Sequence, residues 1–386
     1  MARVPSGPTK TIVPGPCYLG NPALPSRPRA DYSRGRSVMS CLPRTLWPRT
    51  ILSALLTVAP ATLTLAQTPV TPSLASAGPA AAARLELRPS DRVILIGNTL
   101  AERQQHFNNF EAALLAAHPT LDLSVRNLGW SADTLTLQPR PLNFGDAKQH
   151  LTTYGADVIL AFFGANESFA GEAGLAQFEK DLETYVATHL AARYNGESAP
   201  RLALVSPIAH EKLARLVHVD VDARNRELAR YTEAMRRVAA RVHVPFADVF
   251  TPTLEAMRAA RAPLTVNGIH LNEEGDRVFA GILTEALGFG AAPLPEAGKA
   301  FVQLKALLHE KNRLFFLRWR PLNAEYVVGR RVDPFGSVSF PPEMAQLERM
   351  IAEQDKKIWR QVGLVARDAA PSSKRTGSSA PAGGAR

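Results

Sequence analysis

Short apolar runs alternate with longer amphipathic segments between Asp91 and Phe289. The runs contain many β-branched and aromatic residues, which is typical of strands buried on both faces. We predict strands at residues 92–97, 121–129, 156–164, 201–207 and 242–250. We predict helices at residues 101–118, 222–241, 252–261 and 273–287, and a long one that carries Phe178 and Val186. This alternation predicts a five-stranded parallel sheet sandwiched between helices, with ligands bound at the carboxyl ends of the strands.

The C-terminal part of the chain has a different pattern. Residues 290–366 contain predicted helices near 295–311 and 342–360, and we interpret this region as a mainly helical appendage packed on the α/β domain of residues 91–289. Four aromatic side chains of the appendage either pack it onto the core or line a sugar-binding cleft: Phe315, Phe316, Trp319 and Tyr326. Residues 367–386 are rich in Ser, Gly, Ala and basic side chains, so we predict a disordered tail.

The N-terminal region has the pattern of an export signal. Residues 1–38 show no apolar period and are either disordered or a misassigned translation start. Residues 39–66 carry two arginines ahead of an apolar stretch that is short for a membrane span, and Ala66 occupies a small-residue cleavage position. We therefore predict a signal peptide at 39–66, a flexible leader at 67–90, and export to the periplasm or the cell exterior without a stable membrane span after cleavage.

The basic net charge of +10 is concentrated at the two ends of the chain. Residues 67–366 are close to neutral, so composition offers no electrostatic argument for a nucleic-acid partner. Both cysteines, Cys17 and Cys41, precede the predicted cleavage site, so a cleaved chain has neither disulfides nor thiol chemistry. No glycine-rich nucleotide motif and no HExxH zinc motif is present, and we predict no cofactor and no metal.

Four loops at the predicted carboxyl edge of the sheet carry candidate chemistry. Thr99 follows the first strand, Gly129 ends the second, Asn166 follows the third, and His270 lies in a polar turn before the last helix. A hydroxyl, an amide donor and an imidazole are the groups that nucleophilic acyl transfer requires. Each residue also has an ordinary alternative interpretation: a helix cap for Thr99, a loop glycine, a turn asparagine and a solvated surface histidine.

The ordered set of four motifs resembles the SGNH hydrolases, also called GDSL esterases and lipases. The resemblance covers about residues 91–289 and rests on four blocks in this order: Gly97-Asn98-Thr99, Gly129, Gly164-Ala165-Asn166-Glu167 and Asn267-Gly268-Ile269-His270. It implies a flavodoxin-like three-layer α/β/α sandwich and ester hydrolysis through a covalent acyl-enzyme. The implied substrate is a small-molecule or carbohydrate ester with a small acyl group, and polysaccharide O-acetyl groups are one candidate.

The resemblance also implies a role for each matched position. Thr99 is the expected nucleophile and His270 the general base. Asn267 is the expected third member of the catalytic triad, at the position that orients the His270 ring. The expected oxyanion donors are the Thr99 and Gly129 amides and the Asn166 side chain. Further pocket candidates are Gly97, Asn98, Gly164, Glu167, Ser131 and His210.

The chain departs from the family pattern at three positions. Threonine replaces the usual serine at Thr99, and its extra methyl group restricts the side-chain torsion. Asn98 and Asn267 each replace an aspartate, and an amide at Asn267 cannot stabilise an imidazolium by charge. A substitute carboxylate from Glu167, Glu211 or Glu273 is one expectation. The alternative is a catalytically weak or inactive fold that binds carbohydrate or another ligand in the same cleft. The sequence leaves the oligomeric state open.

Overall fold

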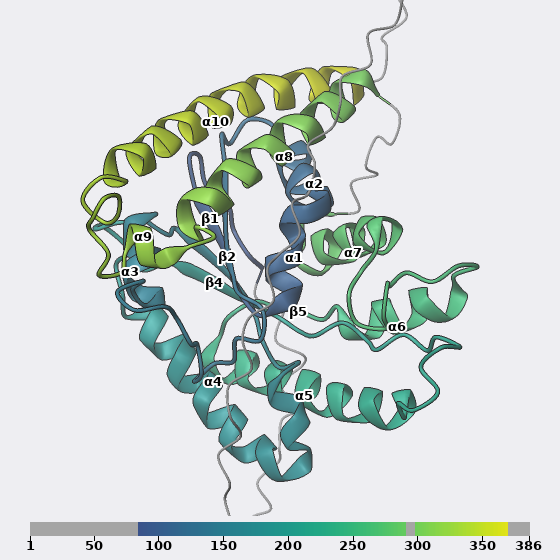
Figure 1. Ribbon diagram of the computed structural model, residues 1–386. Helices are drawn as coiled ribbons and strands as arrows, with labels where there is room; N and C mark the ends of the chain where they lie inside the picture. The colour runs from purple at the N-terminus through teal and green to yellow at the C-terminus, as the bar shows by residue number, and fades with distance from the viewer. Residues whose placement is uncertain (1–83, 291–297, 370–386) are drawn as a thin grey trace, which may run out of the picture. The chain divides into compact units, whose positions relative to one another are not determined.

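A parallel sheet lies at the centre of the computed structural model, which describes residues 84–290 and 298–369 (Figure 1). Within these residues its strands are β1 Arg92–Gly97, β2 Ser124–Gly129, β3 Val158–Phe162, β4 Arg201–Val205 and β5 Phe246–Ala247. The order across the sheet is β2-β1-β3-β4-β5 and every neighbouring pair is parallel. This is the flavodoxin-like order, so the fold class predicted from the pattern and the resemblance is confirmed.

Helices cover both faces of the sheet, as the alternating side chains of β1 show. Val93 and Leu95 face a cluster that includes residues of α2 and α7, whereas Ile94 and Ile96 face residues of α3, α4 and α5. The helix bounds are α1 Thr99–Phe107, α2 Asn109–Ala117, α3 Ala147–Thr153, α4 Leu175–Leu190, α5 Val221–Val242, α6 Phe250–Ala259 and α7 Glu273–Ala286. Two short 3-10 helices, η1 Glu167–Ala170 and η2 Glu172–Gly174, precede α4.

Two local predictions need correction. The predicted helix at 101–118 is interrupted at Asn108, whose left-handed backbone (φ 58°) ends α1 and starts α2. The predicted strand at 242–250 shrinks to the two residues of β5, because α5 extends to Val242 and α6 begins at Phe250. His243 adopts a left-handed conformation between α5 and β5, and Pro245 has no N–H to donate to a neighbouring strand.

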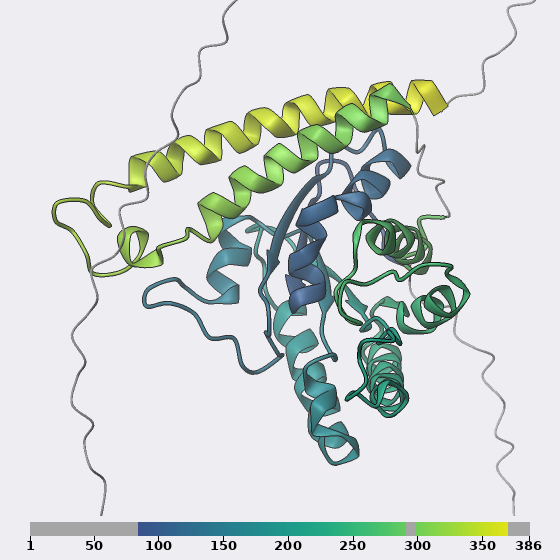
Figure 2. The ribbon, with the colours of Figure 1, turned by 45° about the vertical axis from the view of Figure 1, so that its right-hand side comes forward.

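The C-terminal helices α8 Lys299–Trp319 and α10 Pro341–Ala369 lie side by side (Figures 1 and 2), and the short α9 Ala324–Val327 lies between them in the chain. They contact the outer strand, β2, and the residue just before it through side chains that donate hydrogen bonds to backbone carbonyls. Lys311 Nζ donates to Val125 O (3.0 Å), and Trp359 Nε1 donates to Leu123 O (2.8 Å). The appendage therefore covers an edge of the sheet that would otherwise present unpaired backbone groups.

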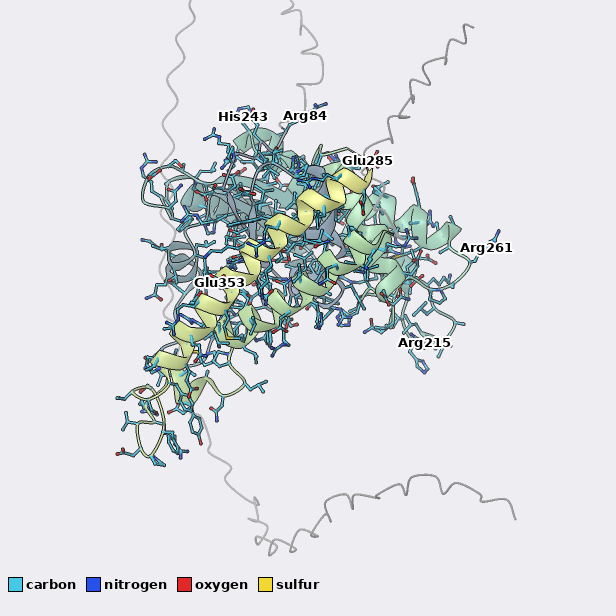
Figure 3. The ribbon with its side chains drawn as sticks, turned by 90° about the horizontal axis from the view of Figure 1, so that it is seen from above. Arg84, Arg215, His243, Arg261, Glu285 and Glu353 are labelled. Carbon is cyan, nitrogen blue, oxygen red and sulfur yellow. The ribbon has the colours of Figure 1, made fainter. Side chains whose placement is uncertain are left out.

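Aromatic residues of α8 contribute to this packing. Phe315 and Trp319 are almost fully buried in the cluster on the α3 and α4 face, which favours core packing over a sugar-binding cleft for these two. Tyr326 instead forms an edge-on contact with Phe340, 6.1 Å between ring centroids. The view from above shows α10, with Glu353, lying alongside α8 (Figure 3).

The folded part of the chain extends beyond two of the predicted domain boundaries. Leu85, in the predicted leader, is buried in the core, so the folded part begins before Asp91. At the other end α10 continues to Ala369, into the predicted tail. The predicted signal peptide and the N-terminal 38 residues lie outside the described residues. Within 84–290 and 298–369, none of the helices has both the length and the apolar composition needed to cross a membrane.

Candidate active site

A pocket of about 350 Å³ lies at the carboxyl ends of the strands, the edge where the motifs were expected to meet. Loops that follow β1, β3 and β4 line it, together with the turn that precedes α7. Its volume falls within the range of about 300–1,000 Å³ that is usual for small-molecule sites. Five of the predicted site residues line it: Asn98, Thr99, Asn166, His210 and His270. Six others lie outside the lining: Gly97, Gly129, Ser131, Gly164, Glu167 and Asn267.

The turn after β1 places Thr99 at the first position of a helix. Gly97 has a φ of 131°, and a Cβ there would lie 2.1 Å from Phe162 O, so only glycine fits. The helix cap is Asn98, whose Oδ1 accepts a hydrogen bond from the Leu100 N–H (3.0 Å). Thr99 is therefore not the cap. Its N–H belongs to the first turn of α1, where amides have no intrahelical acceptor, and Thr99 is one of the residues that line the pocket.

The backbone amide that donates to the Thr99 hydroxyl comes from Ala132, not from Gly129. The Gly129 N–H donates to Asn127 Oδ1 (2.9 Å), and a Cβ at Gly129 would lie 2.3 Å from Glu102 N. Gly129 thus allows the chain to pass close to α1, and its amide is already used. The Ala132 N–H lies 3.4 Å from Thr99 Oγ1, in a residue with a left-handed φ of 67°. The Gly129 N–H is therefore bonded within its own loop, whereas the Ala132 N–H lies beside the Thr99 hydroxyl.

The loop after β3 is fixed by two side chains. Asn166 Nδ2 donates to Asp133 O (2.9 Å), which joins this loop to the one that carries Ala132. The Glu167 carboxylate accepts hydrogen bonds from the N–H groups of Leu135 (2.9 Å) and Gly164 (2.8 Å). Burial raises the Glu167 pKa. Glu167 therefore braces the two loops and is not positioned as a partner of His270.

The other two candidate carboxylates also have different roles. Glu211 is buried and accepts hydrogen bonds from the N–H groups of Leu264 and Thr265, both at 2.8 Å, so it fixes the start of the turn that carries His270. Glu273 is exposed at the first position of α7. Within the part of the chain that the structure describes, no carboxylate forms a hydrogen bond with His270, so the expected substitute carboxylate is not found.

Asn267 determines which nitrogen of His270 carries the proton. Asn267 Oδ1 accepts hydrogen bonds from the N–H groups of His270 (2.9 Å) and Ile269 (3.3 Å), which fixes the orientation of its amide. Its Nδ2 lies 3.1 Å from His270 Nδ1. An amide nitrogen only donates, so Nδ1 accepts and the neutral ring carries its proton on Nε2. Burial, reinforced by the Arg103 charge, lowers the His270 pKa and keeps the ring neutral.

Several pocket residues were not identified from the sequence. Arg103 and Arg224 bring two guanidinium groups to the lining, and Phe169 brings a largely exposed ring over which Arg224 Cζ lies at 3.8 Å. Asp276 is buried at the pocket wall, where burial raises its pKa to about 7. The sequence carried no sign of Ala132, because a left-handed alanine has no local signature. His210, which was expected, packs its ring against the Gly268 backbone.

Comparisons with known proteins match the α/β part of the chain. The model of the GDSL-like Lipase/Acylhydrolase family matches residues 94–278. No curated protein matches the chain.

Among solved structures, a catalytic mutant of Axe2, an acetylxylan esterase from Geobacillus stearothermophilus, is similar at 15% identity, covering 54% of this chain and 99% of that one with a TM-score of 0.43. An α/β hydrolase from the metagenome of Lake Arreo is similar at 19% identity, covering 53% and 97% of the two chains, with a TM-score of 0.40. A gut microbial diltiazem-metabolizing enzyme is similar at 18% identity, covering 54% and 49%, with a TM-score of 0.42.

Proposed function

Because residues 94–278 belong to the GDSL-like lipase/acylhydrolase family, we propose that the protein is an exported hydrolase that cleaves carboxylic esters through an acyl-enzyme on Thr99. One observation carries the proposal: a single pocket collects the Thr99 hydroxyl, the Asn166 amide and the His270 imidazole, with the Ala132 N–H 3.4 Å from Thr99 Oγ1. These are the nucleophile, the base and the donors that acyl transfer needs.

The proposed reaction has two half-reactions. Thr99 Oγ1 attacks the ester carbonyl carbon while His270 Nε2 takes its proton. The resulting oxyanion is stabilised by the Thr99 and Ala132 N–H groups, and the Asn166 side chain lies at the same pocket wall. Collapse expels the alcohol, which receives the proton from His270. Water then attacks the acyl-threonine by the same route and releases the carboxylic acid and the free hydroxyl.

The pocket supports an acyl group larger than acetyl as well as small ones. Apart from the catalytic groups, much of its lining is apolar: Phe162, Phe163, Ile208, Val219 and Leu228. Polysaccharide O-acetyl groups remain one candidate substrate, and the acyl length is a measurable property of the site. Export is proposed on the apolar stretch before Ala66 alone.

Turnover of p-nitrophenyl butyrate by the full chain tests the proposal. We expect measurable hydrolysis by the parent, and loss of at least about 100-fold in kcat in Thr99→Ala and in His270→Ala. Thr99→Ser retains the hydroxyl and removes the crowding methyl group, so its kcat should equal or exceed that of the parent. Parent-like turnover in both alanine variants would remove these residues from the mechanism.

A second candidate function follows from the orientation of Asn267. With its proton on Nε2, His270 presents an N–H donor to the pocket and cannot accept the Thr99 proton there. Turnover therefore has to proceed through the less stable tautomer, in which Nδ1 carries the proton and Nε2 is free. This favours the alternative of a weakly active or inactive fold that binds its ligand in the cleft. Absence of turnover in the parent together with saturable binding of butyrate would support that alternative.

A further inference from the structure

The loop that carries Ala132 is connected to the C-terminal appendage through Arg320, the residue immediately after α8. Arg320 lies outside residues 94–278, the part of the chain that matches the family. Its Nη1 donates to Glu102 Oε1 (2.7 Å), and its guanidinium carbon lies 3.9 Å from the centroid of the Trp130 ring. One side chain of the appendage thus contacts both α1 and the loop after β2.

These two contacts lie next to the proposed reaction centre. Glu102 is one turn after Thr99 on α1, and its second oxygen, Oε2, accepts a hydrogen bond from Ser131 Oγ. Trp130 and Ser131 directly precede Ala132, the residue whose N–H approaches Thr99 Oγ1. The connection formed by Arg320, Glu102 and Ser131 therefore links α1, which carries Thr99, to the loop that carries the Ala132 N–H.

A second arginine, from the loop itself, also contacts the Trp130 ring. Arg140 lies over the same indole, 4.3 Å from the ring centroid, and pairs with Asp133 (2.5 Å). The Trp130 side chain consequently contacts two guanidinium groups, one from its own loop and one from the appendage. A cation over a tryptophan face is attracted by the electrons of the ring, and the partly buried Arg320–Glu102 pair adds a directional hydrogen bond.

We infer that Arg320 is a positioning residue for catalysis, which sets the distance between the Thr99 hydroxyl and the Ala132 amide by holding Trp130 and Glu102 together. The role of the appendage at the site then goes beyond covering the edge of β2. The kinetic part of this inference rests on the proposed hydrolysis, whereas the structural part does not. Small displacements of reacting groups cost up to about 100-fold in rate, so a positioning residue is expected to act mainly on kcat.

The test compares Arg320→Ala with Arg318→Ala in the full chain. Arg318 lies on α8, two residues before Arg320, and pairs with Glu348 of α10 (2.9 Å), so its variant also removes an arginine ion pair of the appendage. Among the described residues, no hydrogen bond or ion pair joins Arg318 to the loop at 130–133. We expect Arg320→Ala to lower kcat about 10- to 100-fold with KM changed less than about threefold, and Arg318→Ala to stay within about twofold of the parent.

Two further variants separate positioning from general loss of structure. Arg320→Lys retains the charge for Glu102 but lacks the planar group that stacks on Trp130, so it should recover only part of the lost kcat. Glu102→Gln combined with Arg320→Ala should be little worse than Arg320→Ala alone, because both act through one connection. Fully additive losses would contradict a shared connection.

Amide hydrogen exchange of residues 129–135 gives a readout that needs no turnover. We expect faster exchange there in Arg320→Ala but not in Arg318→Ala. Unchanged exchange together with unchanged kcat overturns the inference and leaves the proposed hydrolysis intact. If the parent itself shows no turnover, the hydrolysis proposal fails, and the exchange comparison alone decides whether Arg320 holds the loop.

Discussion

Asn267 is the residue on which the chemistry of the site depends most. Its Oδ1 is held by two backbone N–H groups, so its Nδ2 faces His270 Nδ1. A carboxylate at this position would keep both backbone bonds and accept a hydrogen bond from Nδ1–H, so that the ring proton stays on Nδ1. The bare Nε2 would then face the pocket, which is the state that a general base requires.

We therefore expect Asn267→Asp to raise kcat. In a serine protease the reverse change, from carboxylate to amide, lowers kcat about 10⁴-fold, and here we expect a gain of about 10- to 1,000-fold. Asn267→Ala is the control, since it removes the backbone bonds as well and should lower kcat. Steady-state turnover of p-nitrophenyl butyrate measures all three proteins, and an Asn267→Asp rate no higher than that of the parent would contradict the proposed tautomer.

The same pair of proteins should differ in pH dependence. The neutral form of His270 is the base, so activity is lost as the pH falls through its pKa. Burial and Arg103 lower that pKa in the parent, which places the acid limb of kcat/KM below about pH 6.5. The added charge of Asn267→Asp favours the imidazolium and should move the limb to higher pH. A limb at the same pH in both proteins would argue against His270 as the titrating base.

At the scale of elements, η1 and α5 contribute one wall of the pocket, which in the proposed reaction would contact the acyl group. Phe169 of η1 is 76% exposed yet lines the pocket, and Arg224 of α5 lies over its ring. Arg224 Nη2 also donates to Ala165 O (2.7 Å) and Ser168 Oγ (2.6 Å). These bonds hold η1, the short helix that carries Phe169, against α5. Val219 and Ile269, both partly exposed, extend the apolar surface at the pocket.

This wall predicts a preference for acyl chains longer than acetyl. Burying one methylene contributes about 0.8 kcal/mol, so kcat/KM should rise about fourfold per added CH₂ from acetyl to butyryl and level off when the pocket is full. Phe169→Ser should reduce this gain, and Leu137→Ser, at an exposed residue outside the pocket, should not. An acetyl ester as good as or better than the butyryl ester would show that the wall does not bind the acyl group.

At the scale of the whole domain, a buried ionic network attaches the appendage to the α/β core. Lys311 is 0% exposed, and its Nζ contacts Glu111 Oε1 (2.7 Å), Asn312 Oδ1 (2.7 Å) and Val125 O (3.0 Å). Asn312 in turn donates to Asn108 Oδ1 (2.6 Å) and Glu111 Oε2 (2.8 Å). Every partner is a polar group whose burial is costly unless this network forms.

Removing one member of the network should therefore destabilise the fold strongly. Lys311→Ala leaves Glu111 buried without its cation, and we expect the free energy of unfolding to fall by about 3–5 kcal/mol. Lys311→Met combined with Glu111→Gln removes both charges at similar volume and should cost much less. Urea denaturation measures both variants, and equal losses would show that pairing of the charges contributes little.

Much of this protein could be predicted from its sequence because strand burial and helical periodicity are local properties. The runs at 92–97 and 201–207 became β1 and β4, and parallel strands necessarily bring their following loops to one edge. That rule predicts that Thr99 and Asn166 lie at one edge, whereas His270, in the turn between α6 and α7, was expected there from the family resemblance; all three line one pocket.

Tertiary structure alone decided the details of the site, because these depend on contacts between distant segments and on single backbone angles. Only the left-handed turn at Ala132 and the close passage of Gly129 against α1 determine which amide faces Thr99. Only the packing of α8 brings Arg320 to Trp130 and Glu102, far away in the chain. Residue types and spacing predict which groups are available, whereas the hydrogen-bond partner of each group is settled when the segments pack.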